Sequence, residues 1–260
     1  MPDKPNRPQA KRADATLESA KGWIKKLLPG WLLRLRGEYL TRKEKQQHAQ
    51  RVFTRIYEQG TWGKSSDPAQ RFYSGSGSHD ADIVGTYVGA ILEFLSSLAK
   101  KPDAVDLGCG DFSVGTRVRH LCGKYIACDI VKPVIAWNRQ RFKDDNVDFR
   151  VLDITRDKLP GGDIAFLRQV LQHLSNEQIQ RAVGQIAARY KYLVLTEHLP
   201  ASDTFAHNLD KPVGGDIRLG FNSGIVLTSA PFNLQVQEAV VLCEVAESDG
   251  IIRTILYRLA

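Results

Sequence analysis

The sequence predicts an α/β fold, with a seven-stranded, mostly parallel sheet that ends in an antiparallel hairpin and has helices on both faces. Short apolar runs alternate with amphipathic segments along most of the chain, which is typical of parallel strands joined by helices. The last two apolar runs instead follow each other directly around Ser248-Asp249-Gly250, a turn typical of a hairpin. The seven predicted strands are residues 104–107, 125–130, 147–152, 163–167, 192–196, 235–245 and 251–259.

Three parts are expected along the chain. Residues 1–60 form a basic extension, partly disordered and partly amphipathic helix. Residues 61–100 hold a Gly/Ser-rich loop and a helix, which apolar residues at helical spacing place at 81–98. Residues 101–260 form the α/β domain, in which a further helix runs from about Asn176 to Arg189.

The net charge of +7 lies entirely in the extension. Residues 1–50 carry 12 Lys and Arg against 5 Asp and Glu, so the rest of the chain is balanced. An enzyme that binds nucleic acid usually spreads basic residues along its binding face, so nucleic acid is a disfavoured partner.

The segment 17–36 has the spacing of a basic amphipathic helix that contains Trp23 and Trp31. It predicts either peripheral contact with an anionic membrane surface or packing on the domain or a partner subunit. Nothing in residues 1–15 resembles a signal peptide, and the cysteines form no C-x-x-C pair. We therefore expect a cytoplasmic protein, at the inner face of a membrane if this segment binds lipid.

The loop at residues 60–79, GTWGKSSDPAQRFYSGSGSH, is rich in Gly and Ser and contains aromatic side chains. Backbone N–H groups and hydroxyls in such a loop suit a phosphate, a carboxylate or sugar hydroxyls, whereas a flexible linker has the same composition. We interpret the loop as a lid over the site, with substrate contacts from Trp62, Tyr73, Ser76 and Ser78.

The motif VDLGCGDFSVG, Val105 to Gly115, places a Gly-rich turn after the first strand. Open α/β sheets bind nucleotide-like ligands at such a turn, because glycine lets the backbone approach the ligand closely. Asp129 and Asp153 follow the second and third strands, where carboxylates can accept hydrogen bonds from ribose hydroxyls and an adenine amine.

The motifs DAVDLGCG, YIACDI, FRVLDIT, GDIAFLRQVLQHL and YLVLTEHL resemble those of class I S-adenosylmethionine-dependent methyltransferases, over about residues 103–260. The resemblance implies a Rossmann-like fold, S-adenosyl-L-methionine as cofactor and methyl transfer as the reaction. It implies that Asp129 binds the ribose and Asp153 the adenine amine, while residues 168–173 lie beneath the sulfonium. The implied cofactor-binding residues are Asp106, Gly108, Cys109, Gly110, Asp129, Ile130, Asp153, Ile154, Arg168 and Gln169.

The turn departs from the family pattern at one position. A further glycine is usual at position 112, where this chain has Phe112, so we expect the turn to run differently there. The G-x-G-x-x-G pattern of nicotinamide dehydrogenases also fails, since Ser113 stands where its third glycine would be.

Candidate catalytic groups follow the fourth and fifth strands, namely His173, His198 and Glu197. Methyl transfer to an amine or hydroxyl is helped by a general base, and histidine titrates near neutrality. Each histidine could instead have a packing role, and Glu197 could orient the acceptor.

The segment after the fifth strand is polar, and we expect substrate contacts from Asn208 and Arg218. A small polar acceptor, such as a carbohydrate or glycolipid precursor methylated on oxygen or nitrogen, fits this composition. The alternatives are a protein or RNA methyltransferase that uses the extension and a non-catalytic module that binds the cofactor. No metal site is predicted, because the Cys and His residues lack zinc-like spacing.

Overall fold

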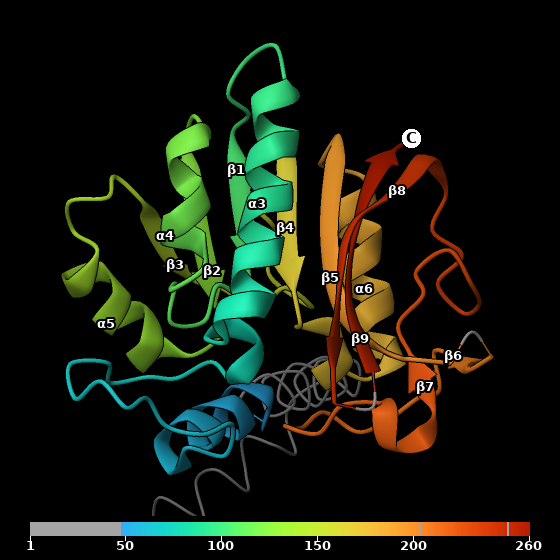
Figure 1. The fold of residues 1–260 in the computed structure, drawn as a ribbon, viewed down its shortest axis with the longest axis horizontal. Coiled ribbons are helices and arrows are strands. Elements are labelled where there is room, and N and C mark those ends of the chain that lie inside the picture. Colours follow the sequence, from blue (N-terminus) through green and yellow to red (C-terminus); the bar gives the residue numbers. More distant parts are fainter. Residues whose placement is uncertain (1–47, 203, 249) are drawn as a thin grey trace, which may run out of the picture. The chain divides into compact units, whose positions relative to one another are not determined.

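A seven-stranded sheet with strand order β3-β2-β1-β4-β5-β9-β8 organises the chain (Figure 1). The computed structural model describes residues 48–260 except 203 and 249, so the segment 17–36 lies outside the described residues. Five strands run parallel, and β9 pairs antiparallel with both β5 and β8, which confirms the predicted fold. The strands are β1 (Ala104–Leu107), β2 (Tyr125–Asp129), β3 (Asp148–Val151), β4 (Ile164–Arg168), β5 (Tyr192–Pro200), β8 (Val236–Glu247) and β9 (Gly250–Leu259).

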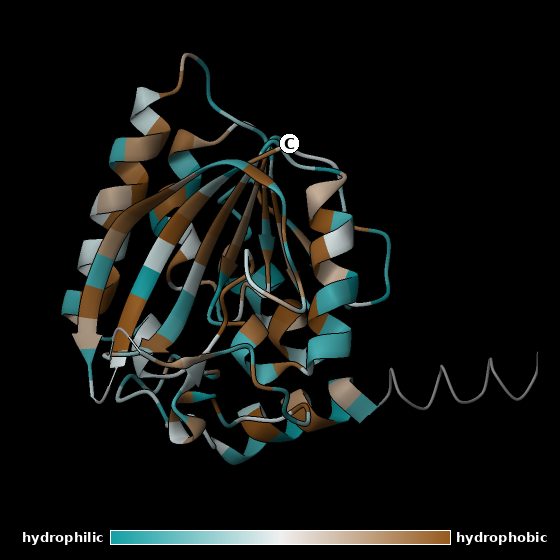
Figure 2. Ribbon diagram, turned by 90° about the vertical axis from the view of Figure 1, so that its right-hand side faces the viewer, coloured by the Kyte–Doolittle hydropathy of each residue, from teal (hydrophilic) through white to brown (hydrophobic). Residues whose placement is uncertain are grey.

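Helices cover both faces of this sheet (Figure 2). Successive strand residues alternate between two cores, so that Val105 packs in the cluster that contains α6 while Ala104 packs in the cluster that contains α3. The helices are α3 (Ala81–Ser97), α4 (Gly115–Val118), α5 (Lys132–Arg141) and α6 (Asn176–Ala187), with helical residues at 48–59 and 3-10 turns η1 (Ser76–Ser78), η2 (Arg119–Leu121), η3 (Leu171–His173) and η4 (Leu219–Phe221).

Side-chain caps fix where two of these helices begin. The Asp80 carboxylate accepts hydrogen bonds from the first N–H groups of α3, and a capping box between Ser175 and Gln178 starts α6. Both helices begin at the predicted residues. Among the described residues, none of the helices is long and apolar enough to cross a membrane.

Residues 49–260 form one compact unit. Phe53 and Ile56, on the helical turns before residue 60, pack in the same core as the sheet. The boundary that the sequence predicted at residue 60 therefore falls inside this unit. A small two-stranded sheet, β6 (Ala206–His207) and β7 (Ser223–Gly224), lies within the long segment between β5 and β8.

Candidate active site

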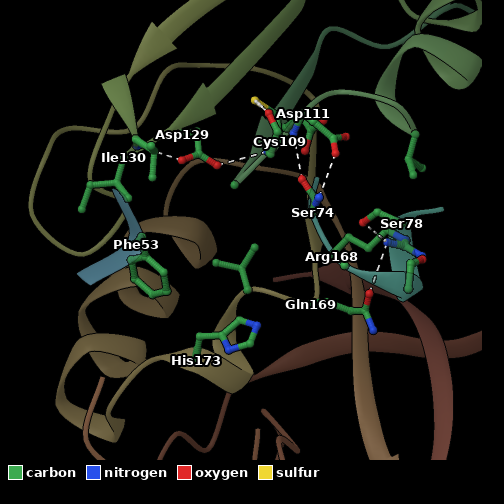
Figure 3. Close-up of a pocket in the computed structure, with 18 of the residues that line it drawn as sticks. Phe53, Ser74, Ser78, Cys109, Asp111, Asp129, Ile130, Arg168, Gln169 and His173 are labelled. Atoms are coloured by element: carbon green, nitrogen blue, oxygen red, sulfur yellow. Dashed lines mark hydrogen bonds between the residues drawn. The ribbon is translucent and has the colours of Figure 1, made fainter. Parts of the chain in front are cut away.

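A cavity of about 290 Å³ opens at the carboxyl ends of the parallel strands, the lower end of the sheet in Figure 1. Figure 3 shows polar side chains from several strand ends and from the loop before α3 pointing into it. Fifteen of the predicted site residues line this cavity, namely Asp106, Gly108, Cys109, Gly110, Asp129, Ile130, Asp153, Ile154, Arg168, Gln169, His173, His198, Trp62, Ser76 and Ser78. Glu197, Tyr73, Asn208 and Arg218 do not line it.

The Gly-rich turn takes positive φ angles at every second residue: +86° at Gly108, +54° at Gly110 and +63° at Phe112. Position 112 therefore keeps the left-handed conformation that a glycine adopts without strain. Phe112, a non-glycine residue, occupies this conformation at a steric cost.

Burial of the Phe112 ring offsets this cost. The side chain is fully buried and packs edge-on against Tyr125, Phe142 and Phe149, with ring centroids 5.0–5.7 Å apart. Such aromatic pairs are favourable beyond the burial of their surface. The buried aromatic cluster around Phe112 thus holds the Gly-rich turn in place.

Asp129 braces the turn from the end of β2. One carboxylate oxygen accepts a hydrogen bond from the Gly110 N–H at 3.1 Å, and the other accepts one from Val131 N–H at 2.8 Å. Burial raises the pKa of Asp129 to about 6 and that of Asp106, which accepts from the Tyr125 hydroxyl, to about 7.

Asp153, after β3, keeps one oxygen without a hydrogen bond. Its Oδ1 accepts from the N–H and the hydroxyl of Thr155, at 2.9 and 2.7 Å. Its Oδ2 is buried and has no hydrogen-bond partner, with the Arg156 Nε 4.0 Å away. A buried carboxylate oxygen in this state is costly unless a ligand donates to it.

The loop before α3 is tied to the Gly-rich turn through Asp111, which is not among the predicted site residues. Asp111 accepts from Ser74 N–H at 2.8 Å and pairs with His79 Nε2 at 2.7 Å, while its own N–H donates to the Ser74 hydroxyl. Although burial opposes it, the hydrogen bond and charge of His79 hold the pKa of Asp111 below its usual value. Tyr73 stacks on His79 at 4.3 Å outside the cavity, so it supports the loop rather than lining the site.

Arg168 holds the same loop from the end of β4. Its guanidinium donates to the carbonyl of Gly77 and, at 3.1 Å, to the hydroxyl of Ser78, and it lies over the Tyr87 ring at 5.0 Å. Its Nε is buried without a hydrogen-bond partner, and burial lowers its pKa. Residues 74–79 of the loop are thus held in place beside the cavity.

At the other end of the cavity, His173 contacts the side chain of Gln172. The amide oxygen of Gln172 accepts from the backbone N–H of His198 at 3.3 Å, which orients the amide nitrogen toward His173 Nε2 at 3.4 Å. Nε2 of His173 is the accepting atom in this contact, because an amide nitrogen only donates, and Nδ1 is buried without a hydrogen-bond partner. Burial, aided by the charges of Lys211 and Arg218, lowers the pKa of His173 to about 4.

Aromatic side chains enclose this end. The His173 ring lies 5.0 Å from Trp62 and 6.3 Å from Phe53, and Trp62 packs edge-on against Tyr57. Trp62 is fixed because its indole N–H donates to the Gly215 carbonyl at 3.2 Å. Phe53 and Tyr57 come from the helical residues before the loop, which the sequence assigns to the extension.

Glu197, a predicted catalytic candidate, does not line the cavity and instead binds backbone groups of the η3 turn. Its carboxyl oxygens accept from the N–H groups of Leu171 and Gln172, each at 3.0 Å, and so hold the η3 turn that carries His173. Burial raises its pKa to about 8. His198 lines the cavity, but its Nε2 donates to the Glu247 carbonyl at 3.1 Å and is therefore not free to take a proton.

Asn208 and Arg218, from which the sequence predicts substrate contacts, do not line the cavity and bond mainly backbone groups. Asn208 donates to the carbonyls of Val226 and Ala230, both at 2.9 Å. Arg218 is 1% exposed and donates to the carbonyls of Leu171, Gln172, Leu174 and Leu209. These residues hold the segment after β5 in place.

Comparisons with known proteins agree with this geometry. Residues 104–191, about a third of the chain, match the family model of a methyltransferase domain. Over these residues the chain is therefore similar to methyltransferase domains. No curated protein sequence matches the chain.

Solved methyltransferase structures share the fold at low sequence identity. The N-methyltransferase NodS from Bradyrhizobium japonicum, in complex with S-adenosyl-L-homocysteine, is 18% identical over 67% of this chain and 84% of its own (TM-score 0.50). Magnesium protoporphyrin IX methyltransferase from Synechocystis is 15% identical over 83% and 97% (TM-score 0.52). Human N-acetylserotonin methyltransferase is 19% identical over 81% and 59% (TM-score 0.51).

The site of this methyltransferase domain fits S-adenosylmethionine. The Asp153 Oδ2, which has an ion pair with Arg156 but no hydrogen-bond partner, would suit the adenine amine, a donor, and the Asp129 carboxylate lies beside the turn where ribose hydroxyls would bind. The Arg168 guanidinium, with its unpartnered Nε, supplies a cation for the carboxylate of the methionine part. No group of three or more Cys, His, Asp or Glu suited to a metal ion occurs in the part of the chain that the structure describes.

Proposed function

We propose that this chain transfers a methyl group from S-adenosylmethionine to an oxygen or nitrogen of a small polar acceptor, with His173 as the general base. The observation that carries the proposal is the neutral His173 imidazole at the cavity wall, whose Nε2 receives only a long hydrogen bond of 3.4 Å from Gln172. An acceptor O–H or N–H can replace so weak a bond and place its proton on Nε2.

The protein's own residues account for the remaining requirements of the reaction. Bound S-adenosylmethionine supplies an electrophilic methyl group, and S-adenosylhomocysteine leaves. Asp111 and Arg168 hold the loop over the cavity, which limits water around the reacting groups. Glu197 fixes the η3 turn and thereby the position of the His173 ring, so it acts as a positioning residue.

The loop beside the site supports a small acceptor. Residues 74–78 line the cavity and are held there by Asp111 and Arg168, an arrangement that suits a small molecule better than a protein or RNA segment. Within this class we propose a carbohydrate or glycolipid precursor, because the Trp62 ring can stack on the apolar face of a sugar. The polar segment after β5 no longer supports this choice, since Asn208 and Arg218 bind backbone groups.

Transfer of labelled methyl groups tests the proposal. The purified full chain is incubated with methyl-labelled S-adenosylmethionine and either the ultrafiltrate or the heat-treated retentate of a cell extract. We expect label in the ultrafiltrate, strongly reduced by His173→Ala and much less by the matched variant His198→Ala. Calorimetry with S-adenosylhomocysteine checks that both variants keep the cofactor site.

Other outcomes separate the alternatives. Label in the retentate alone would favour a protein or RNA acceptor. Cofactor binding without label in any fraction would reduce the chain to a cofactor-binding module. Full transfer by His173→Ala would remove this residue as the base.

A further inference from the structure

The order of the strands gives the amino-acid part of the cofactor a place in the cavity. Asp153 follows β3 and Asp129 follows β2, and these two acids fit the adenine and the ribose. Because β1 and then β4 come next in the sheet, a cofactor laid across the strand ends brings its methionine part over the Gly-rich turn and Arg168. The groups that cover this turn are therefore candidates for contacts with the methionine part.

Two hydroxyl groups cover the turn at Gly110. A Cβ atom on this glycine would lie 2.4 Å from the Ser74 Oγ and 3.1 Å from the Tyr57 hydroxyl oxygen. Both side chains line the cavity, and the two oxygens are hydrogen-bonded to each other at 3.0 Å. Figure 3 shows Ser74 joined to Asp111, the residue that follows Gly110 in the turn.

The hydrogen bonds of this pair leave one hydroxyl hydrogen without an acceptor. The Ser74 oxygen accepts from the Asp111 N–H at 2.9 Å, and it shares one hydrogen bond with Tyr57. Within the described residues, neither hydroxyl has a further hydrogen-bond partner. Two hydroxyl hydrogens therefore serve one hydrogen bond, and the second is available to a ligand in the cavity.

The surroundings of the pair favour Tyr57 as the residue that donates to this ligand. If Ser74 donates to Tyr57, each oxygen accepts one hydrogen bond and donates one, in a chain that runs from the Asp111 N–H into the cavity. Hydrogen bonds in such a chain polarise and strengthen one another. Burial raises the pKa of Tyr57 well above its usual value, so its hydroxyl keeps its proton at neutral pH.

We propose that the Tyr57 hydroxyl binds the carboxylate of the methionine part of S-adenosylmethionine, together with the Arg168 guanidinium. Of the two charged groups of an amino acid, only the carboxylate accepts a hydrogen bond, because an ammonium group only donates. Tyr57 lies in the helical residues 48–59, outside the residues 104–191 that match the methyltransferase family model. The end of the predicted extension thus completes the cofactor site, whatever the acceptor is.

Two ligands that differ only in the carboxylate test this role. Calorimetry measures the affinity of the full chain for S-adenosylhomocysteine and for its decarboxylated analogue, which keeps the adenosine, the thioether and the amine. We expect Tyr57→Phe to weaken S-adenosylhomocysteine binding about 10-fold, the value of a hydrogen bond to a charged group, and to change binding of the analogue by less than about 2-fold. Tyr73→Phe is the matched control, because it removes the same atom from a ring outside the cavity lining.

Phenylalanine at position 57 keeps the edge-on ring contacts with Trp62 and Phe72, and circular dichroism checks that the variant is folded. Equal weakening of both ligands by Tyr57→Phe would overturn the carboxylate contact. Weaker S-adenosylhomocysteine binding in Ser74→Ala but not in Tyr57→Phe would make Ser74 the donor and overturn the assignment to Tyr57. Unaltered affinity in both variants and in the double variant would remove the hydroxyl pair from the cofactor site. None of these measurements depends on methyl transfer, so they stand apart from the test of His173 as the base.

Discussion

The difference in stability between a glycine and an alanine variant should have opposite signs at Phe112 and at its neighbour Phe149. Both rings are buried in one aromatic cluster, but Phe112 has φ +63° while Phe149 lies in strand β3. Removal of either ring costs about 3–5 kcal/mol of unfolding free energy. Alanine and glycine at each position remove the same ring, so their difference isolates the backbone.

The magnitude follows from the backbone angle. At position 112, alanine retains left-handed strain of about 1–2 kcal/mol, whereas glycine avoids it but loses about 0.5–1 kcal/mol in chain entropy. We therefore expect Phe112→Gly to be more stable than Phe112→Ala by roughly 0.5–1 kcal/mol. In strand β3 the backbone carries no left-handed strain, so only the chain-entropy cost of glycine applies. Phe149→Gly should therefore be less stable than Phe149→Ala by about 0.5–1 kcal/mol.

Urea unfolding of the four variants, followed by circular dichroism, measures both differences from the midpoints and slopes. The Phe149 pair is the control for a general effect of glycine. If Phe112→Ala equals or exceeds Phe112→Gly in stability, the left-handed strain assigned to this turn is refuted.

Three further predictions concern charged groups. Asp153→Ala should weaken S-adenosylhomocysteine binding by about 10-fold or more, the value of a hydrogen bond to a charged group; unchanged affinity in calorimetry would remove Asp153 from the adenine subsite. Arg218→Ala should lower the unfolding free energy by about 3 kcal/mol or more while folded protein still binds S-adenosylhomocysteine, since several buried carbonyls lose their donor. The cofactor-free protein should lose stability as pH rises from about 6.5, above which His173 is neutral in both states, to about 8, because the pKa values of Asp106 and Glu197 are raised to about 7 and 8, so the folded state holds protons that the unfolded chain releases. A thermal midpoint that rises over this range, or a slope that Asp106→Asn leaves unchanged, would contradict that assignment.

The sheet could be predicted from the sequence because it depends on local patterns. Apolar runs placed all seven strands, and β1 has the predicted bounds. The main difference is β5, which continues to Pro200 because β9 pairs with it along its whole length. That extension depends on a partner strand about fifty residues away, which the composition of residues 197–200 does not reveal.

The site was predictable where strand ends determine it. Asp129 and Asp153 line the cavity because the carboxyl ends of parallel strands meet at one edge of the sheet. Side-chain partners distant in sequence were not predictable. Asp111 contacts Ser74 across 37 residues, and Arg218 contacts Leu171 across 47. A polar residue after β5 looks the same in sequence whether it binds a substrate or a backbone carbonyl.

The carboxyl groups that line the cavity also bear on product release. The methyl donor carries a positive sulfonium, and the product that remains after transfer has an uncharged thioether in its place. The carboxyl groups at the ends of β1, β2 and β3 therefore attract the donor more strongly than the spent product. The same carboxyl groups therefore favour binding of the positively charged donor over the uncharged product, which promotes replacement of S-adenosylhomocysteine by S-adenosylmethionine after each turnover.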